Sequence, residues 1–162
     1  MHSFDIKTKI YYGDGALDRL TQIPYKKVMI ITDPFVVQSG MVMMITSHLD
    51  EAKIEFEVFK DVVPDPPIDK VVAGVKAVMD YKPEAIVAVG GGSAIDTAKA
   101  VSHLYTAMDK EQRPRLVAVP TTSGTGSEVT SFAVISDPEA KAKYPLRDAA
   151  MVPDVALLDP AL

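Results

Sequence analysis

The sequence predicts an α/β fold in which a largely parallel sheet is covered by helices on both faces. Apolar, β-branched segments alternate along the chain with segments whose apolar residues recur every three or four positions. Such alternation is typical of parallel strands joined by helices. The segments 85–90 and 115–120 are apolar at successive positions, so both faces of these strands are expected to be buried. A chain of 162 residues suits one domain.

The pattern predicts a definite order of elements. They are a short strand and glycine-bearing turn at 9–20, a buried strand at 26–33, a helix at 34–52, an edge or half-covered strand at 53–62, an amphipathic helix at 68–82, a buried strand at 84–90, a second amphipathic helix at 94–108, and strands at 115–120, 132–136 and 155–159. No internal repeat and no low-complexity linker interrupts this order.

Residue types at the boundaries support these elements. Asp33 followed by Pro34 is a helix-start signal, although Gly40 in the middle of the helix that follows costs about 1 kcal/mol relative to alanine. Alternating apolar and polar residues favour an edge strand at 53–62, and the "VPDPP" segment ends it. The helix that begins at Ile68 is expected to end before Pro83.

Composition excludes several classes of function. The formal net charge is -5 and the sequence pI is about 5.1, so the positive field that drives nucleic-acid binding is absent. The chain has no cysteine, which excludes disulfides and thiolate metal sites and permits a reducing compartment. Neither a secretion signal nor a membrane helix is indicated. We therefore expect a cytoplasmic protein with no nucleic-acid or membrane partner.

Three consecutive glycines, Gly90 to Gly92, stand where a buried strand gives way to a helix. Glycine lets an anion approach the backbone closely, and the helix N-terminus that follows offers free N–H groups to a phosphate. Ser93 is expected to cap this helix, and Asp96 could return a hydrogen bond as in a capping box. A tight turn with close helix packing explains the glycines equally well. Ile95 stands where a G-x-G-x-x-G motif needs glycine, and no G-K-S/T follows.

A second unusual segment, "PTTSGTGSEVT" at 120–130, also follows an apolar strand. Its hydroxyls and exposed N–H groups could bind phosphate or ribose oxygens, although a polar surface loop is the simpler explanation when it is taken alone. Loops at the carboxyl ends of parallel strands meet in one crevice. The two segments are therefore expected to converge on one ligand.

The motifs "GGGSAIDTAKA" and "PTTSGTGSEVT", followed by "LRDAAMVPDVALLDPAL", make the chain similar to the iron-containing (group III) metal-dependent alcohol dehydrogenases. The likeness extends over essentially the whole chain. It implies that residues 1–162 are a Rossmann-like, dinucleotide-binding N-terminal domain. It also implies that the family's all-helical second domain is missing after Leu162, so that the chain is truncated.

The resemblance assigns cofactor-binding roles to residues of both motifs. Gly91, Gly92, Ser93 and Asp96 would meet the pyrophosphate and adjoining ribose, and Thr121, Thr122 and Thr125 the phosphates and the nicotinamide side. Lys143 matches a family lysine near the nicotinamide ribose. Asp33 matches the carboxylate that faces the adenosine ribose, where it would accept from the 2′-OH and repel a 2′-phosphate, favouring NAD over NADP. Asp65 matches another position at the cofactor's edge, although a turn explains it more simply.

In that family one Asp and three His from the helical domain hold the catalytic metal. This chain has only His2, His48 and His103, with no HxxxH pair, and none of them matches a ligand position. His48 and His103 are therefore interpreted as structural or surface residues. The ligands of the iron or zinc are expected to lie outside this chain.

The resemblance implies a full-length parent that is an NAD-dependent alcohol dehydrogenase, interconverting a small alcohol and its aldehyde or ketone by hydride transfer. This chain alone would be inactive. Two alternatives stay open: a glycerol-dehydrogenase-like or dehydroquinate-synthase-like enzyme, which shares the GGGS turn, and a nucleotide-binding module without catalysis. A domain separated from its neighbour exposes apolar surface, so self-association is also expected.

Overall fold

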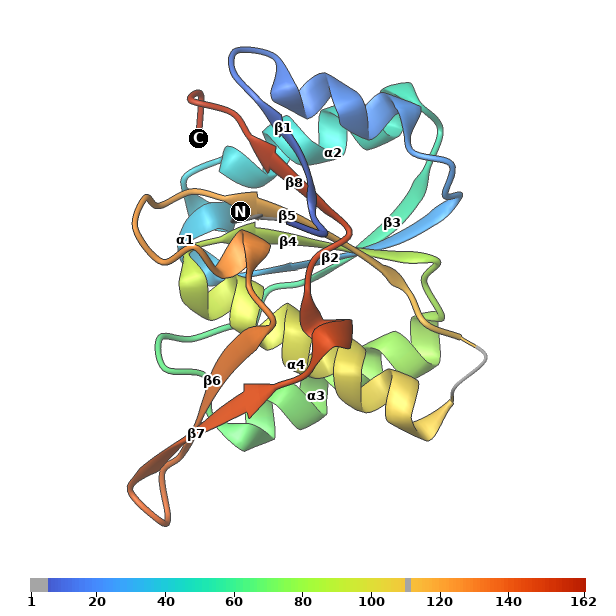
Figure 1. The fold of residues 1–162 in the computed structure, drawn as a ribbon. Coiled ribbons are helices and arrows are strands. Elements are labelled where there is room, and N and C mark those ends of the chain that lie inside the picture. Colours follow the sequence, from blue (N-terminus) through green and yellow to red (C-terminus); the bar gives the residue numbers. More distant parts are fainter. Residues whose placement is uncertain (1–5, 110–111) are drawn as a thin grey trace, which may run out of the picture.

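The computed structural model describes residues 6–109 and 112–162 and contains two sheets. The strands are β1 (Lys9–Tyr12), β2 (Lys27–Thr32), β3 (Glu55–Phe59), β4 (Ala85–Gly90), β5 (Arg115–Pro120), β6 (Phe132–Asp137), β7 (Ala142–Arg147) and β8 (Val155–Leu158). Six of them form a parallel sheet in the order β1-β8-β5-β4-β2-β3, and β6 and β7 form a separate antiparallel pair (Figure 1). The central strands are aligned so that Ala88 of β4 pairs with Ile31 of β2 on one side and with Ala118 of β5 on the other.

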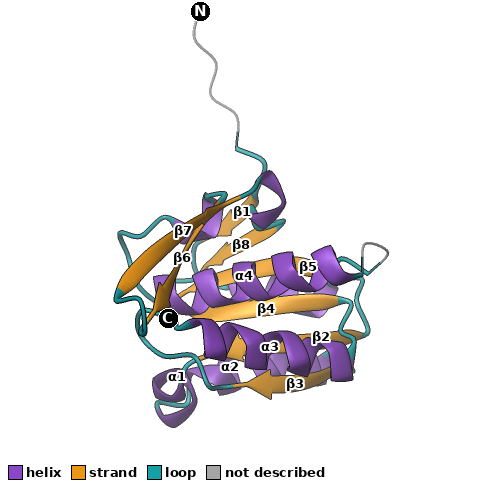
Figure 2. Cartoon of the chain, turned by 90° about the horizontal axis from the view of Figure 1, so that it is seen from below, coloured by secondary structure: helices purple, strands orange, loops and turns teal. Residues whose placement is uncertain are grey.

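The helices cover both faces of the large sheet. They are α1 (Pro34–Gln38), α2 (Met41–Glu51), α3 (Ile68–Tyr81), α4 (Gly92–Met108) and the short 3-10 helices η1 (Ala16–Gln22), η2 (Ser127–Val129) and η3 (Ala149–Met151). Figures 1 and 2 show α3 and α4 on one face and α1, α2 and η1 on the other. This arrangement confirms the predicted fold class.

One apolar core lies on each face of the large sheet. Met29, Ile86 and Ala118 face α3 and α4, whereas Ile30, Val87 and Val117 face α1, α2 and η1. Every residue of β4 is buried, because this strand is flanked by two others and covered on both faces. The unbroken apolar run at 85–89 follows directly from that position.

The helix predicted at 34–52 is wrong as a single element. Gly40 adopts a φ of 83°, a left-handed conformation that ends the path of α1 and starts α2 in a new direction. The start signal was correct, since Asp33 caps α1 by accepting a hydrogen bond from the Val36 N–H at 3.0 Å. Residues 53–62 contain the edge strand β3, as expected.

The segment 132–136 is a strand, β6, but it does not join the large sheet. It pairs with β7, which the sequence pattern did not indicate, and it packs against α4 instead. The residues of β7 are mostly exposed, so this strand lacks the apolar pattern by which a strand is recognised.

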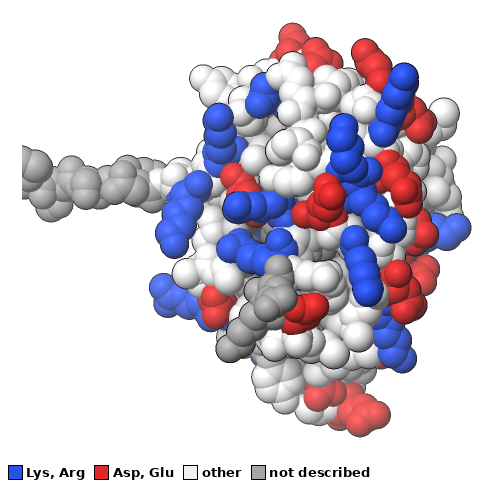
Figure 3. Space-filling view, turned by 90° about the vertical axis from the view of Figure 1, so that its right-hand side faces the viewer, with Lys and Arg blue, Asp and Glu red and all other residues white. Residues whose placement is uncertain are grey.

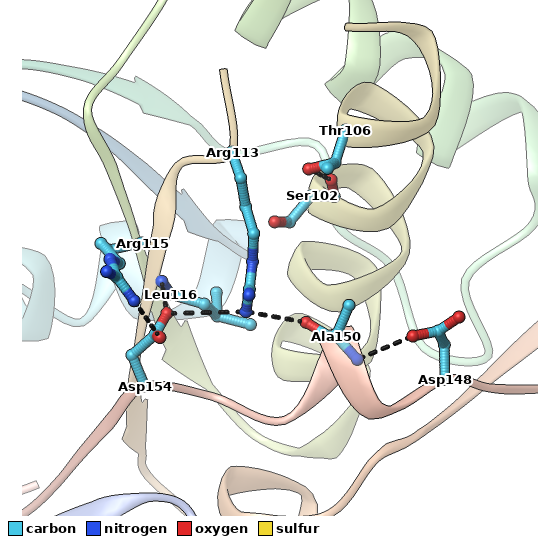
Figure 4. Close-up of polar contacts among 8 residues, drawn as sticks. All are labelled: Ser102, Thr106, Arg113, Arg115, Leu116, Asp148, Ala150 and Asp154. Carbon is cyan, nitrogen blue, oxygen red and sulfur yellow. Dashed lines mark hydrogen bonds and ion pairs between the residues drawn. The ribbon is translucent and has the colours of Figure 1, made fainter. Parts of the chain in front are cut away.

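The chain from β7 to β8 is fastened to β5 and to the residues just before it by polar contacts at the edge of the sheet opposite the glycine turn. Asp154 accepts hydrogen bonds from the Arg115 guanidinium and the Leu116 N–H, both at 2.9 Å, and Arg113 donates to the Ala150 carbonyl (Figure 4). On the face drawn in Figure 3, positive and negative side chains are intermingled. In the ranges 6–109 and 112–162, every helix is too short or too polar to traverse a bilayer.

Candidate functional site

A cleft of about 550 Å³ lies at the carboxyl ends of β2, β4 and β5. The connection after β2 leads outward to β3, whereas the connection after β4 leads to β5 on the other side. Loops that diverge in this way leave a crevice, which is where open α/β sheets bind ligands. The lining residues come from four segments: Asp33, Pro34, Phe35, Val36, Met41; Val62, Val63, Pro64; Gly91, Gly92, Ser93, Ala94; and Thr121, Thr122.

The glycine turn has little room for side chains. Gly90 has a φ of 143°, and a Cβ atom there would lie 2.8 Å from Ala94 Cβ and 3.1 Å from Asp33 Oδ2. A Cβ atom at Gly92 would lie 2.9 Å from Thr125 Cγ2, and one at Gly91 would lie 3.3 Å from Thr122 Cγ2. The turn is therefore held close to both neighbouring loops, with its backbone bare on the side of the cleft.

The hydroxyl-rich loop at 121–131 forms the wall beside this turn. The Thr121 N–H donates to the Gly90 carbonyl at 3.0 Å, which joins the start of the loop to the end of β4. Thr122 and Thr125 then pass over Gly91 and Gly92. The sequence-based expectation that the two motifs converge is confirmed by these contacts.

The structure brings together six of the ten predicted site residues in the cleft: Asp33, Gly91, Gly92, Ser93, Thr121 and Thr122. Thr125 lies behind the turn, where its hydroxyl accepts from the Ser127 N–H at 3.3 Å. Asp65 and Lys143 contact each other instead, with 2.6 Å between Oδ1 and Nζ, and both side chains are mostly exposed. Asp65 also has a φ of 49°, as the turn explanation requires.

The predicted capping box at Ser93 and Asp96 is wrong. The N-cap of α4 is Gly91, and among the described residues no side chain bonds to the N–H groups of this helix end. Asp96 turns away to the loop, accepting from the Ser127 hydroxyl at 2.5 Å and the Val134 N–H at 2.9 Å. The first turn of α4 thus keeps its N–H groups uncapped by side chains at the edge of the cleft, which favours an anion.

Sequence reasoning missed two features of the site. Phe35, Met41 and Val62 give the cleft an apolar side, and the segments that carry them were interpreted only as a helix at 34–52 and an edge strand at 53–62. Lys99 was missed because it is charged, yet its side chain is fully buried in α4. Its spacing of four from Ile95 and three from Ser102, both buried on the same helix, is the signal that places it on the inner face.

Two other hollows are poorer candidates. One of 730 Å³ lies between α3 and the turn of the β6–β7 hairpin, away from the strand ends, and is lined by Ile68, Val72, Asp137 and others. One of 290 Å³ lies beside Arg113, whose guanidinium already contacts the Ala150 carbonyl and Asp154. Neither combines bare backbone with a strand end, so the cleft at the glycine turn is the candidate site.

The described residues do not supply a metal centre. Within 6–109 and 112–162, no three His, Asp or Glu side chains lie close enough together to hold an ion. His48 contacts the Met44 carbonyl and Asp18 on the surface, in agreement with its structural interpretation. His103 lines the hollow beside Arg113, and His2 lies outside the described residues.

Comparison with known proteins decides the family. The model of a family described as iron-containing alcohol dehydrogenase matches residues 7–160. The chain belongs to the iron-containing alcohol dehydrogenase family. The chain is 43% identical over 162 residues to the 1-propanol dehydrogenase PduQ of Citrobacter freundii. The match covers 100% of this chain and 43% of that protein.

Two other similar proteins are described with different cofactors. The NADPH-dependent butanol dehydrogenase of Clostridium saccharobutylicum is 36% identical over 177 residues, covering 100% of this chain and 46% of that protein. A sulfoacetaldehyde reductase from Bifidobacterium kashiwanohense, solved in complex with NAD+, superposes with a TM-score of 0.85 at 27% identity, covering 99% of this chain and 46% of that one. The chain thus spans less than half the length of the relatives it matches.

Proposed function

We propose that this chain is the N-terminal, NAD-binding domain of a longer metal-dependent alcohol dehydrogenase that interconverts a small alcohol and its aldehyde or ketone. The observation that carries the proposal is the single cleft in which Asp33, the glycine turn and the threonine loop meet. Membership of the iron-containing alcohol dehydrogenase family supports the reaction class. The share of the relatives that the chain covers supports a division of labour with a further domain.

The residues of the cleft fit a dinucleotide. A pyrophosphate needs close approach to N–H groups, and Gly91 and Gly92 line the cleft without side chains that would hold it away. Thr121 and Thr122 also line an adjoining hollow of 630 Å³ that extends to Leu158 and Leu162. An elongated ligand can therefore extend from Asp33, over the glycines, to this second hollow. Phe35 and Val62 can then pack against an apolar ring of that ligand.

When bound, NAD supplies the group that accepts hydride from the alcohol carbon or returns it. The residues of this chain bind and orient that cofactor. Because the described residues hold no set of metal ligands, we assign no step of the reaction to a metal held by them. We expect the purified chain to bind NAD weakly and to show no alcohol oxidation; measurable turnover would contradict this division. A cytoplasmic location, self-association and roles for Asp65, Asp96, Thr125 and Lys143 at the cofactor stay predictions.

Cofactor preference tests the site most directly. Asp33 both caps α1 and presents a carboxylate to the cleft, and Asn is an equally good cap without the charge. In fluorescence titrations of the chain with NADH and NADPH, Asp33→Asn should shift the ratio of the two dissociation constants about tenfold toward NADPH. Its melting temperature should stay close to that of the unsubstituted chain.

The alanine variant separates the two roles of Asp33. Asp33→Ala should show the same shift in preference and, in addition, lose about 1 kcal/mol of stability with the cap. A chain that binds neither nucleotide at millimolar concentration would overturn the proposal. An unchanged NADH to NADPH ratio in both variants would remove Asp33 from the site.

A further inference from the structure

Helix α4 contains a lysine that is fully buried and fully hydrogen-bonded. Lys99 is 0% exposed, and its ammonium donates to Ser127 Oγ at 3.1 Å, Thr130 Oγ1 at 3.0 Å and the Phe132 carbonyl at 2.8 Å. An ammonium has three N–H donors, so every donor is used. All three acceptors belong to the chain that follows β5, and none belongs to the six-stranded sheet.

Asp96, one turn earlier on α4, contacts the same segment. Its Oδ1 accepts from the Ser127 hydroxyl, and its Oδ2 accepts from the Val134 N–H. The Ser127 hydroxyl therefore accepts from Lys99 and donates to Asp96, so that one serine joins the two charged residues. The charges compensate each other through this hydroxyl, which is buried together with the Lys99 side chain.

This cluster costs free energy to bury. Burial lowers the pKa of Lys99 to about 8, while Asp96 on α4 and Glu128 on η2 act in the opposite direction. An apolar side chain of similar size could fill the same space without that cost. What an apolar side chain cannot do is fix three oxygen atoms of a loop in defined positions. The hydrogen bonds therefore specify where the loop lies.

The position of this loop matters for the cleft. Its first residues, Thr121 and Thr122, line the cleft, and Thr125 packs on Gly92. Gly124 and Gly126 have φ values of 115° and 64°, and these two glycines make the backbone of the loop flexible. We propose that Lys99 is a positioning residue which, with Asp96 and Ser127, holds residues 121–131 against α4 and so sets the affinity for the nucleotide. The inference rests on the proposed function.

Hydrogen exchange of the chain without nucleotide tests the contact itself. Lys99→Met keeps the bulk of the side chain and removes its donors, and Ser127→Ala removes the bridging hydroxyl should the first variant fold poorly. Lys76→Met, at an exposed lysine of α3, is the matched control. Amides of 121–131 should exchange about tenfold faster in both variants, with β4 amides and the control unchanged. Unchanged loop exchange would overturn the inference.

The pH profile separates positioning from simple packing. When the loop opens, Lys99 meets water and regains an ordinary pKa of about 10.4, so opening takes up a proton between pH 8 and 10. Opening must then become less favourable as pH rises, and loop protection, corrected for intrinsic exchange, should increase. Lys99→Met should flatten this slope. A slope of the opposite sign, or the same slope in Lys99→Met, would overturn the inference.

Fluorescence titration with NADH completes the test. Lys99→Met and Ser127→Ala should raise the NADH dissociation constant about tenfold, whereas Lys76→Met should leave it unchanged. Faster loop exchange with unchanged NADH affinity would overturn the link to the nucleotide. Were the unsubstituted chain to bind no NADH, the proposed function would fail, while the exchange data would still decide whether Lys99 holds the loop.

Discussion

The two walls of the cleft follow neighbouring strands, β4 and β5, yet they are built in different ways. The glycine turn after β4 is short and local, because Gly90 and the start of α4 fix it within a few residues. The threonine loop after β5 is longer and depends on distant residues, Lys99 and Asp96 of α4. One wall is therefore determined by backbone geometry and the other by tertiary hydrogen bonds.

This difference teaches that an anion site can combine a rigid half with an adjustable half. Bare backbone at the turn gives close approach but little selectivity among nucleotides. Hydroxyls on the loop add specific contacts only where the loop is held in place. Substitutions that strain the turn should therefore cost stability, and substitutions that displace the loop should weaken binding.

The largest effect is expected at Gly90. Gly90→Ala combines a φ of 143° with a Cβ placed 2.8 Å from Ala94 Cβ, and should lower the free energy of unfolding by about 3 kcal/mol. Gly124→Ala in the loop has a similar φ, 115°, but no neighbour within 4 Å, and should cost only about 1 kcal/mol. Urea denaturation of both variants measures the difference. Equal losses would erase the contrast between a packed turn and an open loop.

The next effect concerns the pair beneath the loop. Asp96→Asn leaves the buried Lys99 charge with Glu128 as its remaining counter-charge and should cost about 2 kcal/mol of stability. In a Lys99→Met background the same substitution should cost at least about 1 kcal/mol less. A double-mutant cycle by urea denaturation gives this coupling, and additive losses would show that Ser127 does not join the two residues.

A smaller effect on binding is expected where the two walls touch. Gly92→Ala places a Cβ 2.9 Å from Thr125 Cγ2, whereas Gly91→Ala places one 3.3 Å from Thr122 Cγ2. The first should displace the loop and raise the NADH dissociation constant about tenfold, and the second only about threefold. Titration of each variant, with circular dichroism as a check of folding, tests the order. The reverse order would mean that the loop yields at Thr122 first.

The smallest effect is a dependence of stability on pH. The folded state holds the Lys99 proton less tightly than the unfolded state, because burial lowers this pKa to about 8. The unfolded chain therefore binds more protons between pH 8 and 10, and the free energy of unfolding should rise with pH by less than about 1.4 kcal/mol per unit.

The difference between the unsubstituted chain and Lys99→Met isolates this contribution. It should be measured by urea denaturation from pH 7.5 to 9.5, because burial raises the pKa of Tyr81 to about 12 and this residue then acts only at higher pH. A difference that falls with pH in this window would contradict the assignment.

Much of the fold followed from local patterns. The buried strands at 26–33, 84–90 and 115–120 were recognised because strands covered on both faces are apolar at every position. Asp33 as a helix cap was recognised because capping needs only neighbouring backbone. The strand β7 was not, because its exposed residues carry no periodic signal and only its partner β6 defines it.

The sequence by itself determined where the glycine turn and the hydroxyl loop lie along the chain, and the order of strands and helices that delivers both to one edge. Those features depend on residue type and on neighbours in the sequence, so they can be predicted without the folded structure. Only the tertiary structure decided what Asp96 and Lys99 do, since their partners lie 28 to 38 residues away in the chain. A carboxylate near a helix start can serve as a cap in isolation, but in the folded chain Asp96 meets the buried Ser127 hydroxyl and the Val134 N–H, and those contacts prevail.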